Sequence, residues 1–325
     1  MSDTLIKKGL ISIISRNPPQ SHIASNRLLI RLHTSHPKTN EICEQLNKIE
    51  AGFAGEQLVD RSILEVSFPK DLYIFTDLQL KIHDYLYIQL DTLIVTKKYL
   101  LIIEVKNMVG TITFQPHKGQ VIRNLDGVRT PFECPITQIN RHIHAIGQMQ
   151  LPLPIFKAIV YSSNRVILEN VPPGEPIFFR KNLPLYIQNL NNIEDSINTS
   201  QFEEVIKKIQ LRRSTFQQKP LCERWNIHPE TLIRGLLCKN CGKSLCKITN
   251  KTWKCTNCKA VDRNPIAHNI DDYFILIKDS ITTAECKDFF GLSSSHEAYY
   301  MLKKCNLQSI NHGKKTVYRK KSGIF

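Results

Sequence analysis

The sequence predicts a mixed α/β domain followed by two small modules at its C-terminal end. Runs rich in β-branched and aromatic residues alternate with stretches of helical periodicity between residues 40 and 213. Four cysteines then form two C-x2-C pairs between residues 237 and 261, which is a metal-binding spacing. The remaining tail is basic and contains two short helical patterns.

The composition excludes a disordered chain and points to an anionic partner. Hydrophobic residues make up 42% and charged residues 22% of the 325 residues, which is ordinary for a globular protein. The formal net charge is +15, so nucleic acid or an acidic membrane surface is the expected partner. The sequence has no apolar run near the roughly 18 residues of a membrane helix, and no secretory signal. We therefore expect a cytoplasmic protein with no membrane segment, whose ten cysteines are thiols or metal ligands.

The first elements are a lead segment and a helix. Residues 1–36 are mixed and basic, and we expect a loosely attached N-terminal segment there. Apolar residues recur at helical intervals over residues 42–65, with Thr39 as a possible N-cap. Gly52 and Gly55 lie inside that pattern, so they either allow close packing or break the helix.

The next elements are mainly strands. The third strand-like run is apolar on both parities until Glu104, so we expect a central strand that is covered on both faces. A linker should follow Arg213. The strands are predicted at 71–80, 85–95, 99–106, 111–114, 120–122 and 155–161, and the helices at 137–151 and 192–210.

Two of these strands carry a cluster of charged side chains. Glu104 and Lys106 are two residues apart, so they project from the same face of their strand, opposite Val105. Asp91 lies on the preceding strand and faces Glu104 if the two strands pair as a hairpin. Two converging carboxylates can hold a hard cation such as Mg²⁺, and the lysine can position a water molecule and stabilise developing negative charge. The alternative is an ordinary solvated charge pair, but charges that end an apolar strand are costly to bury without a role.

This arrangement resembles the PD-(D/E)xK nuclease superfamily, and more closely its nuclease-related domain (NERD) family. The resembling segments are Gly52-Phe53-Ala54-Gly55-Glu56, Gln89-Leu90-Asp91, Glu104-Val105-Lys106-Asn107 with Gly110, and Pro135-Ile136-Thr137-Gln138. They extend over about residues 48–160. Leu90 replaces the proline of the superfamily name, and Cys134 stands where an asparagine is expected.

The resemblance implies a restriction-endonuclease-like mixed sheet flanked by helices, and a role for each site residue. Asp91 and Glu104 would bind the catalytic Mg²⁺ or Mn²⁺, and Lys106 would assist the water. Glu56 would be an additional carboxylate of the site, and Gln138 would contact the site or the substrate. Taken alone, Glu56 reads equally well as a helix-surface charge and Gln138 as a helix cap. His142 and His144, near Gln138, read as surface residues.

The cysteine pairs predict a zinc ribbon. Cys238 and Cys241 form the first C-x2-C pair, Cys255 and Cys258 form the second, and 13 residues separate the two pairs. Four thiolates suit tetrahedral Zn²⁺ and leave no open position for catalysis, so the metal should be structural. A redox dithiol is the alternative, although one C-x2-C pair would suffice for that. Cys246 and the other five cysteines have no ligand spacing.

The tail resembles a winged helix-turn-helix module. Residues 282–290 and 295–304 read as helices around a turn at 291–294, and 314–321 as the strand of a basic wing. Between residues 235 and 325 there are 16 basic and 7 acidic residues. Tyr299 and Tyr300 are candidates for contact with phosphates or bases, and the alternative is a helical docking module.

Together these features predict a metal-dependent nuclease that hydrolyses phosphodiester bonds in DNA. The predicted domains are an N-terminal segment (1–36), a NERD nuclease-like domain (37–213), a linker (214–234), a zinc ribbon (235–262) and a helix-turn-helix or winged-helix-like basic domain (263–325). A non-cleaving DNA-binding protein and a nuclease acting on RNA remain the alternatives. The sequence identifies no protein partner.

Overall fold

The computed structural model describes residues 3–6, 16–214, 219–249, 251–312 and 315–321. Contacts divide the chain into two compact units. The first unit combines Met1–Pro19 with Ile49–Phe216, and the second combines Gln20–Lys48 with Gln217–Phe325. This division differs from the expected boundary at residue 36, because the segment after Pro19 packs with the C-terminal part of the chain.

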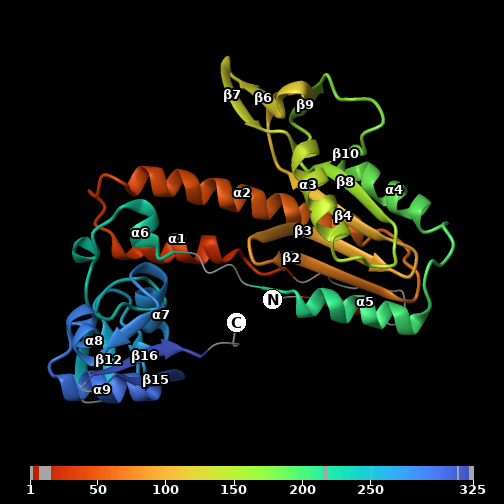
Figure 1. Cartoon of the computed structure of the whole chain (residues 1–325). Coiled ribbons are helices and arrows are strands. Elements are labelled where there is room, and N and C mark those ends of the chain that lie inside the picture. The colour runs from red at the N-terminus through yellow and green to blue at the C-terminus, as the bar shows by residue number, and fades with distance from the viewer. Residues whose placement is uncertain (1–2, 7–15, 215–218, 250, 313–314, 322–325) are drawn as a thin grey trace. The chain divides into compact units, whose positions relative to one another are not determined.

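A six-stranded mixed sheet forms the centre of the first unit (Figure 1). Its order is β1-β2-β3-β4-β8-β10, with antiparallel pairing from β1 to β4 and parallel pairing from β4 to β10. Leu100–Val105 of β4 are buried, so the expected central strand covered on both faces is confirmed. The bounds are β1 (Asp3–Ile6), β2 (Leu72–His83), β3 (Leu86–Thr96), β4 (Leu100–Lys106), β8 (Ile155–Tyr161) and β10 (Ile177–Phe179).

Helices cover both faces of this sheet. One apolar layer contains Leu101, Ile103 and Val105 of β4 together with residues of α2 (Thr39–Ile63) and α4 (Leu183–Leu190). The opposite layer contains Leu100 and Ile102 together with residues of α3 (Pro135–Gly147) and α5 (Thr199–Leu211). Successive side chains of β4 point into opposite layers because a strand has a two-residue period. Glu104 therefore lies on the same side as Leu100 and Ile102, which is the α3 side. The predicted mixed sheet flanked by helices is therefore confirmed.

The helix expected at residues 192–210 begins later than predicted. Asn198 caps α5 by accepting the backbone N–H of Gln201, and the Gln201 side chain accepts the Asn198 N–H in return. This capping box fixes the helix start, because it satisfies backbone donors that have no partner within the helix. The helix expected at 137–151 instead begins two residues earlier than predicted and also ends earlier, because it occupies Pro135–Gly147.

A separate four-stranded sheet follows β4, in the order β7-β6-β5-β9. Its strands are β5 (Gly110–Gln115), β6 (Gln120–Leu125), β7 (Val128–Glu133) and β9 (Val166–Glu169). Strands β7 and β9 were not among the sequence predictions. Gly110 has φ of 91°, and a Cβ atom there would lie 2.4 Å from the Asn124 carbonyl oxygen, so this position requires glycine.

The second unit joins an N-terminal helix to the C-terminal modules. Helix α1 (Gln20–Arg31) contributes Ala24 and Leu28 to the same core as Ile266 and Phe290, so residues 20–36 are not a loose segment. Arg31 is fully buried, and its Nε donates to Asp272 Oδ2 over 2.7 Å. This pairing between distant residues could not be read from the sequence pattern.

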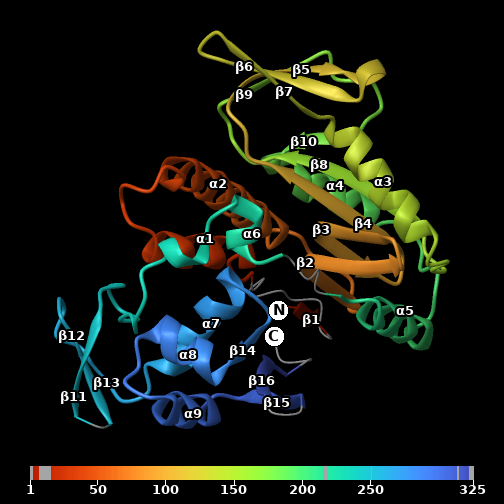
Figure 2. The same ribbon diagram turned by 60° about the vertical axis from the view of Figure 1, so that its left-hand side comes forward.

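The structure has helices at Thr283–Phe290 and Ser295–Lys304 and a strand at Lys315–Lys320, close to the positions expected for the helix-turn-helix and its wing. α8 is capped by Thr282 and ends at Gly291, whose φ of 60° is the left-handed conformation that glycine adopts readily. Figure 2 shows the small sheets of this unit. The elements are α6 (Leu221–Trp225), β11 (Leu245–Thr249), β12 (Thr252–Cys255), β13 (Val261–Asp262), α7 (Ile266–Leu276), β14 (Ser280–Thr282), α8 (Thr283–Phe290), α9 (Ser295–Lys304), β15 (Leu307–His312) and β16 (Lys315–Lys320). Over the described residues, no helix is long and apolar enough to cross a membrane.

Candidate active site and metal centre

The structure brings Asp91 and Glu104 together at the end of a strand pair. Strands β3 and β4 pair antiparallel with Thr92 opposite Ile103, so Asp91 lies beside Glu104. Asp91 Oδ2 accepts the backbone N–H of Val105 over 2.8 Å. Glu104 is only 2% exposed. The hairpin arrangement that the spacing requires is therefore present.

The Lys106 ammonium group bridges one oxygen of Glu104 and the side chain of Gln138. Lys106 Nζ donates to Glu104 Oε1 over 2.7 Å and to Gln138 Oε1 over 2.9 Å. Glu104 Oε2 is buried and has no hydrogen-bond partner in the structure. His142 Nδ1 lies 3.8 Å from this oxygen and also lacks a partner. A buried carboxylate oxygen without a donor is a position that a cation would fill.

Glu56 approaches the site from α2. Gly55 allows this approach, because a Cβ atom there would lie 2.5 Å from Asn107 Cβ and 2.7 Å from Ser162 Oγ. Gly52, in contrast, has open space around it. The close-packing alternative therefore applies to Gly55 and not to Gly52, and the helix continues through both.

Three further charged residues of the site were missed by the sequence analysis. Arg16 donates to Glu56 Oε2 over 2.7 Å and pairs with Asp60. Asp77 stands in β2 with φ of 48°, between the pairs that join β2 to β3, and accepts from Gln89 Nε2 over 2.7 Å. The spacing of Glu56 and Asp60, one helical turn apart, was a usable signal for a shared helix face. Nothing in the mixed basic segment distinguished Arg16.

Burial and mutual repulsion raise the pKa of two of the carboxyl groups. The pKa of Asp91 is raised to about 7 by burial and by the nearby Glu104 charge, against which the Val105 N–H and Lys106 act. The pKa of Glu56 is raised to about 8 by burial and by Asp91, while Arg16 opposes the shift. Carboxyl groups with raised pKa values beside one another are typical of sites that bind a cation or move a proton.

The surroundings of His142 favour its neutral form. Burial, followed by the charge of Lys106, lowers its pKa from the usual value. Its orphaned Nδ1 beside Glu104 identifies it as part of the site wall, and not as the surface residue that the sequence analysis expected.

The donor set fits a hard divalent cation. Asp91 and Glu104 offer carboxylate oxygens, the ligand type that Mg²⁺ prefers, and the orphaned Glu104 Oε2 needs a partner. Within the described ranges, no three carboxylate or histidine side chains are close enough to share one ion. An ion held by this pair would keep several water ligands, which is usual for Mg²⁺.

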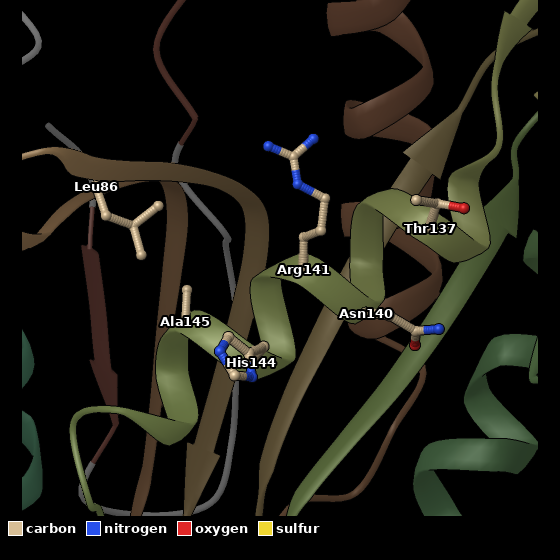
Figure 3. Close-up of a pocket in the computed structure, with 6 residues that line it drawn as sticks. All are labelled: Leu86, Thr137, Asn140, Arg141, His144 and Ala145. Atoms are coloured by element: carbon tan, nitrogen blue, oxygen red, sulfur yellow. The ribbon is translucent and has the colours of Figure 1, made fainter. Parts of the chain in front are cut away.

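A shallow pocket of about 450 Å³ lies beside α3. Figure 3 shows Thr137, Asn140, Arg141 and His144 along the helix, with Leu86 across from Ala145. These polar side chains follow the helix that carries Gln138. The pocket therefore lies along the helix that carries Gln138, and none of the site carboxylates lines it.

The four predicted zinc ligands converge in the second unit. The sulfur atoms of Cys238, Cys241, Cys255 and Cys258 all lie within 4.8 Å of one another. The Gly242 N–H donates to the Cys238 carbonyl over 2.8 Å, which closes the first knuckle. A four-cysteine group of this kind suits tetrahedral Zn²⁺ and leaves no open position. The predicted zinc ribbon, with strands β11, β12 and β13 around it, is therefore confirmed as a fold.

An exposed aromatic and basic face lies on α9, the helix that follows α8 after a short turn. The His296 and Tyr300 rings lie 4.6 Å apart, and the Tyr299 and Tyr300 rings 5.6 Å apart. Lys303 Nζ lies 5.6 Å from the centre of the Tyr299 ring. Tyr299 is 42% and Tyr300 57% exposed. We call these four residues the α9 face.

Comparison with known proteins finds one family match, which lies within the first unit. Residues 51–162 match the family model of the nuclease-related domain, NERD. The matched residues include Glu56, Asp91, Glu104, Lys106 and Gln138. Searches of curated proteins and of solved structures found no significant match.

Proposed function

We propose that the protein is a metal-dependent nuclease that hydrolyses phosphodiester bonds in DNA. The observation that carries the proposal is the Glu104 carboxylate, whose Oε1 holds Lys106 while the buried Oε2 has no partner. With Asp91 beside it, this group forms an oxygen site next to a fixed positive charge. In a domain related to nucleases, that combination fits phosphodiester hydrolysis better than a purely structural ion pair.

Each residue has a specific task in this proposal. Asp91 and Glu104 hold Mg²⁺ or Mn²⁺, and the bound ion supplies Lewis acidity and lowers the pKa of water. Lys106 uses two of its three N–H donors for Glu104 and Gln138, so a third remains for the attacking water or a phosphate oxygen. Gln138 thereby aims the Lys106 ammonium group. Glu56 adds negative charge from α2.

The second unit would hold the nucleic acid. Its proposed zinc ribbon (235–262) and winged helix-turn-helix (263–325) follow the proposed catalytic region along the chain. The region from residue 235 onward carries 16 basic and 7 acidic residues, which favours contact with phosphates. The α9 face adds rings that can stack on bases. The zinc thiolates must stay reduced, which fits our proposal that the protein acts in the cytoplasm.

A second candidate is a nucleic-acid-binding protein that does not cut. Two cations already lie among the carboxylates, because Arg16 pairs with Glu56 and Lys106 pairs with Glu104. This partial charge compensation is the observation that favours a binding protein. RNA as the substrate is a further alternative, because phosphates are common to both polymers.

A cleavage assay separates these candidates. Supercoiled plasmid, linear duplex DNA, single-stranded DNA and RNA are incubated with the full chain and Mg²⁺ or Mn²⁺, with EDTA and Glu104→Gln as controls. The proposal predicts metal-dependent cutting of DNA that is lost in both controls. Salt-sensitive binding without cutting would favour the binding protein, and cutting of RNA alone would identify an RNA nuclease.

A further inference from the structure

A buried arginine joins the helix and the strand that carry the carboxylate site. The Arg16 side chain is only 2% exposed. Its Nε and Nη2 donate to the two carboxylate oxygens of Asp60 over 2.8 and 3.0 Å. Nη1 donates to Glu56 Oε2 over 2.7 Å and to the Asp91 carbonyl over 3.0 Å. Nη2 also donates to Thr92 Oγ1 over 2.9 Å.

This arrangement uses the full donor capacity of the side chain. A guanidinium group has five N–H donors in a rigid plane, and each one has an acceptor here. Asp60 and Glu56 belong to α2, while Asp91 and Thr92 belong to β3. A planar fork of this kind fixes both distance and orientation, which a lysine cannot do. Arg16 therefore sets how α2 and the Asp91 end of β3 face each other.

We propose that Arg16 is a positioning residue of the active site, which holds the Glu56 carboxylate and the Asp91 end of β3 in the geometry needed for cleavage. The inference rests on the proposed nuclease function. It assigns a task to the segment before α1 for which the sequence suggested none. Arg16 acts through Glu56 and Asp91 and does not touch the orphaned Glu104 Oε2, since none of its hydrogen bonds reaches Glu104.

The contacts distinguish this task from a second possibility, in which the Arg16 guanidinium group occupies the cation site until the metal binds. A guanidinium group in the cation site would donate to the metal ligands and would be displaced when the metal binds. Arg16 instead donates two hydrogen bonds to Asp60 and one to Thr92, and neither residue is a proposed metal ligand. Every donor is satisfied within the fold, so the group belongs to the framework of the site.

The test separates positioning from stability with a double variant. Arg16→Met alone leaves Asp60 buried without its partner, which lowers stability whatever the role of Arg16. Arg16→Met combined with Asp60→Asn removes both charges and restores most of that stability. Arg16→Lys keeps the charge without the fork, and Arg61→Met, at an exposed position of α2, is the matched control. Plasmid cleavage at saturating Mn²⁺ and the thermal midpoint are measured for each variant.

Positioning predicts that the double variant folds well yet cleaves about 10- to 100-fold more slowly than wild type, a usual cost of misplaced catalytic groups. Arg16→Lys should also fold well, but it should cleave more slowly than wild type. Arg61→Met should cleave at the wild-type rate. Wild-type cleavage by the double variant or by Arg16→Lys would overturn the inference, and faster cleavage would show that Arg16 competes with the metal. If wild type itself does not cut, the nuclease proposal fails first, and this inference fails with it.

Discussion

The ionised Asp91 carboxylate destabilises the metal-free first unit, so Asp91→Asn should make that unit more stable at high pH. The pKa of Asp91 is about 7, against a usual value of 3.8. Because the folded-state pKa is raised, the cost is absent below about pH 4, grows as the pH rises, and is complete above about pH 7. Each pKa unit corresponds to about 1.4 kcal/mol, so the complete cost is about 4 kcal/mol.

Asparagine is neutral at every pH and keeps an oxygen for the Val105 N–H. Burying its amide N–H group takes back about 1–3 kcal/mol, which leaves a net gain of about 2 kcal/mol at pH 8. Hydrogen exchange of β3 and β4 peptides in EDTA measures this gain within the first unit. The gain should shrink toward pH 5, and Mn²⁺ should protect wild type but not the variant. Asp84→Asn, at an exposed carboxylate in the turn between β2 and β3, is the control. Faster exchange in Asp91→Asn than in wild type at pH 8 would refute the reasoning.

Three further predictions concern the lysine, the zinc ligands and the α9 face. Lys106→Met should slow cleavage by about 10²–10³-fold without weakening Mn²⁺ binding, because it removes a charge from the reacting groups; an unchanged rate would contradict its role. Cys255→Ser should lose Zn²⁺, measured by metal analysis, and expose the buried Trp253, seen as a red shift of its fluorescence; a zinc-free variant with unshifted fluorescence would contradict this. Tyr300→Ala should weaken binding of single-stranded DNA by about 1–3 kcal/mol in a fluorescence anisotropy titration, whereas Tyr85→Ala, also exposed, should not; equal effects would exclude stacking.

The local parts of the fold and site were predictable because their signals lie within a few residues. The apolar run before Glu104 predicted a buried central strand, and the two-residue period placed Glu104 and Lys106 on one face. The C-x2-C spacing predicted the cysteine cluster, since each knuckle is a local structure. In such cases the geometry of a few neighbouring residues determines both the sequence spacing and the observed structure.

The parts that could not be predicted depend on contacts between distant residues. Arg16 meets Asp60 across 44 positions of sequence, and Arg31 meets Asp272 across 241. An isolated arginine in a mixed basic segment carries no local mark of such a partner. For the same reason residues 20–36 looked loosely attached, although Leu28 is fully buried in the core of the second unit.

The most direct test of the account is whether Asp91 and Glu104 bind a divalent cation. Electron paramagnetic resonance of Mn²⁺, titrated into the zinc-loaded full chain, counts the bound ions and gives their affinity. The account predicts a site in wild type that is lost in Glu104→Gln and kept in Arg61→Met. Absence of Mn²⁺ binding in wild type, or equal binding in Glu104→Gln, would contradict it.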